Sequence, residues 1–203
     1  MPPEDRFVCR FAAEPPQDAA PYGRWAEALQ AEFLAACLRI DSEGEDLGEP
    51  GELAWYPDRT WDGRTYVPAT ARTSTGFELF GYVSFARPAD DEDEPGDFAS
   101  SADFTAETAE ANPDWQLDLC DEVIGTWRGE EGKVAQMTLV WGTALVPGGA
   151  VATAELAALA VDQALVTQDR FTLIAPDDYR GDTLSVVVWG ARNNELARES
   201  LYE

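Results

Sequence analysis

The sequence predicts an α+β protein that is mainly antiparallel β, with one long amphipathic helix near the N-terminus. Three observations carry this prediction. Apolar side chains recur at helical spacing across residues 18–40, and from residue 53 onward the apolar period changes to two. No repeated strand–helix alternation follows, which a doubly wound sheet would need. The strands can form a curved sheet, a sandwich or a partial barrel, and the 203 residues suit a single domain, 1–203.

The clearest predicted element is the helix at residues 18–40. Its apolar side chains stand mostly three or four residues apart: Tyr22, Trp25, Leu29, Phe33, Ala36, Cys37 and Ile40. Asp18 can cap the first turn, and Pro21 falls where a missing N–H costs little. Upstream, residues 6–12 alternate like a short strand. Downstream, the acidic and glycine-containing segment 41–53 is expected to end the helix as a surface loop.

Period-two patterns predict strands through most of the remaining chain. The predicted strands are 53–57, 64–72, 76–87, 115–120, 136–146, 170–175, 183–190 and 195–202. Turns are expected at 73–76 and at Asn193-Asn194, because asparagine tolerates the positive φ of tight hairpins. Residues 149–166 stay open between helix and strands, because their alanine and leucine content favours a helix while Val151 and Thr153 favour a strand.

The chain is strongly acidic, with 39 Asp and Glu against 14 Lys and Arg and a net charge of −25. This balance argues against binding to DNA, RNA or anionic membranes, which need a basic face. Three explanations stay open: solubility, a salt-rich cytoplasm, or a basic partner. A cytoplasmic location is expected, because no secretory signal and no run of 18 apolar residues occur. Three widely spaced cysteines fit reduced thiols there.

Few catalytic groups are present. The chain contains no histidine, which removes His-dependent triads, dyads and metal sites. No phosphate-binding loop, dinucleotide-binding fingerprint or nucleophile elbow occurs, and the cysteines are not clustered as zinc ligands. The acidic runs lack the spacing of an EF-hand. We therefore predict no catalytic residue, cofactor or metal site, and carboxylates stay as the groups that an enzyme could use.

Residues 88–112 are predicted to form an acidic loop. Six carboxylates crowd its first ten residues: Asp90, Asp91, Glu92, Asp93, Glu94 and Asp97. Their mutual repulsion, together with nearby proline and glycine, disfavours regular structure. A solvated loop, a docking segment for a basic partner, and weak metal binding all stay open for this stretch.

Aromatic residues are the second candidate binding feature, and seven of them in the chain are tryptophan. Trp55, Trp61 and Tyr82 lie in the aromatic-rich stretch 53–85. Aromatic faces beside carboxylates can bind a small apolar or sugar-like ligand, line a dimer contact, or fill a β-rich core.

Three functional hypotheses follow from these features. The favoured one is a non-catalytic binding or interaction protein that meets a basic protein partner through its carboxylates. The first alternative is a small-molecule-binding, β-barrel-like protein with an aromatic pocket, which could act as an enzyme only through carboxylates. The second is a salt-adapted domain whose charge has no partner. A homo-oligomer stays open in each case.

Overall fold

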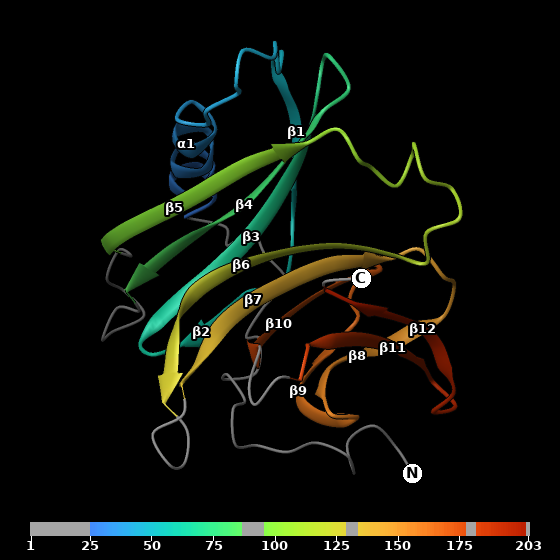
Figure 1. The fold of residues 1–203 in the computed structure, drawn as a ribbon. Coiled ribbons are helices and arrows are strands. Elements are labelled where there is room, and N and C mark those ends of the chain that lie inside the picture. Colours follow the sequence, from blue (N-terminus) through green and yellow to red (C-terminus); the bar gives the residue numbers. More distant parts are fainter. Residues whose placement is uncertain (1–24, 87–95, 129–133, 178–181, 202–203) are drawn as a thin grey trace. The chain divides into compact units, whose positions relative to one another are not determined.

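The computed structural model describes residues 25–86, 96–128, 134–177 and 182–201. They fall into two compact units that divide between Asp114 and Trp115, here called the first and the second unit (Figure 1). The predicted strand 6–12 lies outside the described residues. The single domain 1–203 stays a prediction, because two compact units can unfold together or separately.

The first unit is an antiparallel sheet with one helix packed on it. Its strands run in the order β1 (Pro50–Trp55), β3 (Arg64–Thr73), β4 (Glu78–Ala86) and β5 (Gly96–Thr105), and the short β2 (Arg59–Trp61) pairs with β3. Helix α1 (Ala26–Cys37) lies against β4 and β5 (Figure 1). The core between helix and sheet contains Leu29, Phe33, Val67, Ala69, Val83 and Phe85.

The prediction of a long helix is wrong, because α1 has only 12 residues. Residues 18–24 lie outside the described part, and at the other end the helix stops at Cys37. Leu38, which follows, is 90% exposed, so a longer helix would bury nothing more there. A helix this short is marginal in water by itself. Burial of Leu29 and Phe33 on the sheet, both fully inaccessible, therefore stabilises it.

The prediction of a loop at 88–112 is wrong for residues 96–105, which form β5. Residues 88–95 lie outside the described part. Strand β5 pairs with β4 along almost its whole length. Phe98 and Ala102 face the helix and pack against its core, and Phe104 meets Phe77 edge-on at 5.5 Å. Apolar residues at alternate positions are typical of a strand. The prediction of a loop followed instead from the acidic composition of the stretch.

The second unit contains two antiparallel sheets around one core. One sheet has the order β10 (Arg170–Asp177), β7 (Val134–Ala144) and β6 (Leu117–Arg128). The other has the order β12 (Glu195–Ser200), β11 (Ser185–Gly190), β8 (Gly149–Leu156) and β9 (Leu159–Leu165). Both sheets supply the core, which includes Val140, Phe171, Leu173, Ala154, Val186 and Val188.

The ambiguous stretch 149–166 forms the hairpin of β8 and β9, not a helix. Ala157 and Ala158 make its two-residue turn, with φ of 49° and 61°. Positive φ at both positions is what a type I′ hairpin turn requires. Ala152, Ala154 and Ala164, which favoured a helix, instead face the core, because helix propensity is weaker than strand pairing and burial.

One seam between the two sheets is closed by a side chain. Asp162 on β9 is buried, and its Oδ2 accepts the backbone N–H of Ile174 on β10 at 2.8 Å. Ile174 belongs to the edge strand of the other sheet, whose N–H groups have no ladder partner on that side. The carboxylate thus replaces a missing strand at this position.

The prediction of a mainly antiparallel β protein is confirmed. The described strands make open sheets, and no ladder closes into a ring among them. No described helix has the length and apolar character needed to cross a membrane. The cytoplasmic location stays a prediction.

Candidate functional site

The structure describes only one of the six predicted acidic residues. The other five lie outside the described part of the chain: Asp90, Asp91, Glu92, Asp93 and Glu94. The Asp97 side chain is 78% exposed, and its Oδ2 accepts a hydrogen bond from Arg64 Nη1 at 2.6 Å. An exposed pair of this kind contributes about 1 kcal/mol or less. The charge of Asp97 is therefore already balanced within the chain.

The three predicted aromatic residues do not share one face of the sheet. Trp55 faces α1, and its ring meets Phe33 edge-on at 6.1 Å within the core. Trp61 and Tyr82 lie on the opposite face, on the side of Tyr66, whose ring is 5.6 Å from that of Tyr82. Trp55 is therefore a partly buried residue packed against the core. A ligand role for Trp55, Trp61 and Tyr82 stays a prediction.

An acidic surface outside the predicted site lies at residues 41–52, which we call the acidic segment. Its six carboxylates belong to exposed residues: Asp41, Glu43, Glu45, Asp46, Glu49 and Glu52. The segment has no basic residue. None of the six forms an ion pair within the described part of the chain. From the sequence, residues 41–53 are predicted only as a surface loop.

Hydrogen bonds hold the backbone of the acidic segment in place. The Asp41 and Asp46 carboxylates each accept the N–H two residues further on, at 3.2 and 3.1 Å. The Ser74 hydroxyl accepts the N–H of Glu49 at 3.0 Å, and Thr75 donates to a carbonyl of the segment at 2.6 Å. The predicted turn at residues 73–76 thus anchors the acidic segment through hydrogen bonds. The backbone that carries the six carboxylates therefore has a defined conformation.

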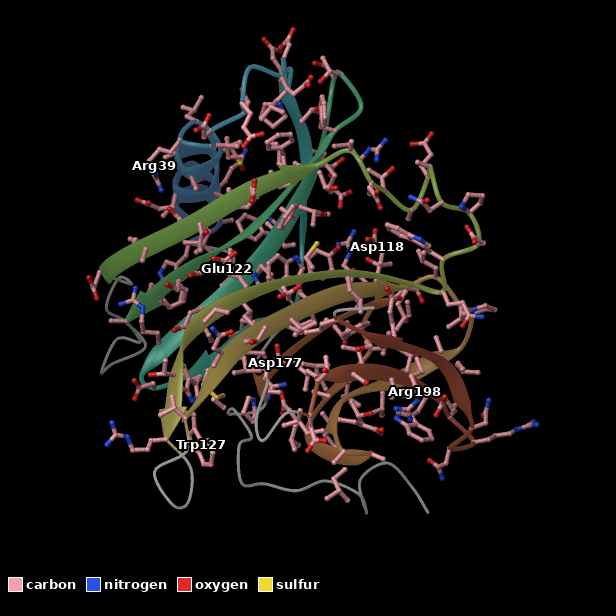
Figure 2. All side chains as sticks on the ribbon, in the orientation of Figure 1. Arg39, Asp118, Glu122, Trp127, Asp177 and Arg198 are labelled. Atoms are coloured by element: carbon pink, nitrogen blue, oxygen red, sulfur yellow. The ribbon has the colours of Figure 1, made fainter. Side chains whose placement is uncertain are left out.

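A second group of carboxylates lies in the second unit, on and beside β6. Asp118 and Asp121 are half-buried on β6, Asp177 is buried at the end of β10, and Glu199 is exposed on β12 (Figure 2 labels Asp118 and Asp177). Burial raises the pKa of Asp121, and the negative charge of Asp177 raises it further. Glu199 is exposed as a residue, but partial desolvation of its carboxyl group raises its pKa, and the negative charge of Asp118 raises it further. Like charges therefore accumulate here at a cost in stability.

Replacing Asp121 by asparagine is expected to raise the free energy of unfolding at neutral pH. The folded pKa of Asp121 lies above its unfolded value, so the folded state keeps a proton that the unfolded state has lost. Stability therefore falls as the pH rises through that interval, and the penalty is complete above it. Asparagine has a similar shape and carries no charge, so it removes the penalty.

Thermal melts at about pH 7 and about pH 3 measure this effect, which should be present at the higher pH and absent at the lower. Asp169→Asn is the control, because Asp169 is exposed in the same unit and has positive φ, which asparagine tolerates. We expect the control to change stability by less than about 0.5 kcal/mol. A lower melting temperature for Asp121→Asn at neutral pH would contradict the prediction.

The second unit also contains an ion pair with one buried partner, Glu155, and one exposed partner, Arg198. Arg198, labelled in Figure 2, donates from Nη1 to Glu155 Oε2 at 3.0 Å and from Nη2 to Glu195 Oε2 at 2.9 Å. Glu155 is only 3% exposed. Thr153 links this pair to the core, because it accepts the indole N–H of Trp189 at 2.8 Å and donates to Glu155. The hydrogen bonds to Glu195 and the one to Glu155, together with the negative charges of these two residues, raise the pKa of Arg198.

Within the described ranges, no group of three or more His, Cys, Asp or Glu could hold a metal ion. Comparisons with protein-family models, curated proteins and solved structures found no match.

Proposed function

We propose that this protein is a non-catalytic binding protein that meets a basic protein partner through its carboxylates. The acidic segment carries this proposal, because its six exposed carboxylates are held on a hydrogen-bonded backbone and form no ion pair within the described part of the chain. A fixed cluster of one sign of charge attracts the opposite sign and raises association rates.

The engagement of the arginines supports the same proposal. Several described arginines are used within the chain: Arg39 with Ser100, Arg64 with Asp97, Arg72 with Glu110, and Arg198 with Glu155 and Glu195. None of these four arginines forms an ion pair with the acidic segment. The arginine or lysine side chains of a partner would therefore be attracted by the unpaired carboxylates of the acidic segment.

The test compares two variants with the same change in net charge. In the first, four glutamates of the acidic segment become glutamine: Glu43, Glu45, Glu49 and Glu52. This leaves Asp41 and Asp46 to hold the turns. In the control, four carboxylates elsewhere in the same unit become amides: Glu27, Asp103, Glu107 and Asp114. An oligoarginine peptide is the probe, and its affinity is measured by calorimetry at low and at high salt.

We expect the acidic-segment variant to bind oligoarginine about tenfold more weakly than the wild type, and the control to lose less than about threefold. Binding should also weaken steeply with salt, since exposed charges are screened. Equal losses in the two variants would show only general attraction to an acidic protein and would contradict a defined surface. If oligoarginine does not bind to the wild type at low salt, the proposal is wrong. The alternative of a salt-adapted domain whose charge has no partner then stays open.

A further inference from the structure

Strand β6 is an edge strand of the sheet β10-β7-β6 and has a ladder on one side only (Figure 1). At its start the N–H of Leu145 donates to the Gln116 carbonyl at 2.9 Å, so the register directs the backbone groups of the even-numbered residues 116–122 at β7. Those of the odd-numbered residues 117–123 point away from β7. Within the described part of the chain, none of these outward N–H groups and carbonyls has a hydrogen-bond partner.

Other edges of the described sheets are protected by side chains. On β5, the Ser100 carbonyl accepts a hydrogen bond from Arg39 at 3.3 Å, and the N–H of Phe104 is bound by Asp103 Oδ1 at 2.8 Å. The edge of β10 is met by Asp162. Proteins usually block or cover an edge strand, because its free backbone groups attract other strands. The longer edge of β6 has no such protection among the described residues, so we expect another strand to cover it.

The side chains of β6 define which strand fits beside it. Leu117 and Leu119 face the core of the second unit. Asp118 and Glu122 lie on the other face, and β6 has no basic residue before Arg128. Residues directly opposite each other on paired strands share a face and interact. A fitting strand therefore carries apolar residues on one face and positive charge on the other.

Residues 6–12 have this alternation. They contain no carboxylate, and their side chains divide into an apolar face and a face with two arginines: Phe7, Cys9 and Phe11 on the first, and Arg6, Val8 and Arg10 on the second. A second copy of β6 fits less well, because its carboxylates would meet those of the first, and like charges directly opposite each other are destabilising.

The connection to the first unit allows this pairing. Residues 13–24 join the segment to the described chain at Trp25, and twelve extended residues can span about 40 Å. A compact unit of this size is about 30 Å wide. The connection therefore does not restrict residues 6–12 to the first unit.

We propose that residues 6–12 add to the edge of β6 as an antiparallel strand, with Arg10 opposite Asp118 and Arg6 opposite Glu122. A carboxylate accepts several hydrogen bonds, so the arginines add to the contacts that Asp118 and Glu122 already make. The sheet then has four strands, and the first unit lies in the sequence between two adjacent strands of the second. This inference is independent of the proposed function.

The same register sets the apolar face of the segment toward the core. Its pairs on that face are Phe11 with Leu117, Cys9 with Leu119, and Phe7 with Asp121. The first two extend the apolar surface of β6. The third sets a ring against a half-buried carboxyl and is the one unfavourable pair.

Disulfide cross-linking tests the register. Val8 falls opposite Cys120 at a pair without backbone hydrogen bonds, where the Cα atoms are about 4.5 Å apart and a disulfide fits. The test protein carries Val8→Cys, Cys9→Ser and Cys37→Ser. The control carries Cys37→Ser alone, because native Cys9 then lies on the opposite face from Cys120. Two protein thiols and one oxidised glutathione give one protein disulfide and two reduced glutathione molecules.

We expect the intramolecular disulfide to form at least about tenfold faster in the test protein than in the control. Intact mass spectrometry under non-reducing conditions measures both rates. Equal rates in the two proteins would show that the proposed register is wrong.

Amide hydrogen exchange tests the added strand without a cross-link. Cys9→Pro removes an N–H that donates to β6, whereas Val8→Pro removes one that points away from it and is tolerated at an edge. We expect the amides of Leu119 and Asp121 to exchange at least about tenfold faster in Cys9→Pro than in the wild type, and to change less than about threefold in Val8→Pro. Amides of β7 should stay slow in all three proteins.

Two results of the exchange experiment would overturn the inference. In the first, the amides of Leu119 and Asp121 exchange in the wild type as fast as in an unstructured chain, which means that the edge is uncovered. In the second, their protection rises with protein concentration, which means that a second copy covers the edge in place of residues 6–12.

Discussion

Replacing Gly81 by alanine is expected to destabilise the first unit by about 3 kcal/mol. Gly81 lies in β4, opposite Ala102 of β5. A Cβ at this position would meet the backbone carbonyl oxygen of Ser101 and lie 2.8 Å from the Cα of Ala102. Both atoms belong to the backbone of β5, so the clash cannot be relieved by rotating a side chain. The two strands would have to separate locally, which weakens their ladder.

The effect of Gly81→Ala should extend to helix α1. The helix packs on β5, and Arg39 just after it donates to the Ser100 hydroxyl of that strand at 3.0 Å. Urea unfolding followed by circular dichroism measures the loss. Gly96→Ala is the matched control, because a Cβ at Gly96 meets nothing within 4 Å. If the two variants had the same unfolding midpoint, the close contact between β4 and β5 would be contradicted.

A loss of similar size, about 3 kcal/mol, is expected in the second unit when Asp162 is replaced by alanine. The change leaves the buried N–H of Ile174 without its acceptor and removes buried side-chain volume. Losing a hydrogen bond to a charged group in the interior costs about 1.5–3 kcal/mol, and an unfilled space adds to that. The seam between β9 and β10 should open first, because no ladder joins these two strands.

Asp162→Asn is the control for this prediction, since its side-chain oxygen can still accept the N–H of Ile174. We expect it to lose about 1 kcal/mol, clearly less than alanine. Native-state hydrogen exchange provides a local readout. In Asp162→Ala the amide of Ile174 should exchange much faster, whereas in Asp162→Asn it should stay protected. Unchanged protection in the alanine variant would show that the carboxylate does not hold the seam.

The candidate sites were only partly predictable from the sequence. The acid-rich run 41–52 was visible as a loop, but its hydrogen bonds to Ser74 and Thr75 come from a turn more than twenty residues away. The register also separates Trp55 and Tyr82, which belong to one aromatic-rich stretch but lie on opposite faces of the sheet.

By itself the sequence determined the net charge of −25, the absence of histidine, and a mainly antiparallel β fold. These properties follow from composition and from the period of two, which are local. Only the tertiary structure decided that α1 is short, that 96–105 and 149–166 are strands, and that Asp162 joins two sheets. Each of these depends on burial and hydrogen bonding between residues distant in the chain. Such contacts outweigh local preferences of less than about 1 kcal/mol per residue.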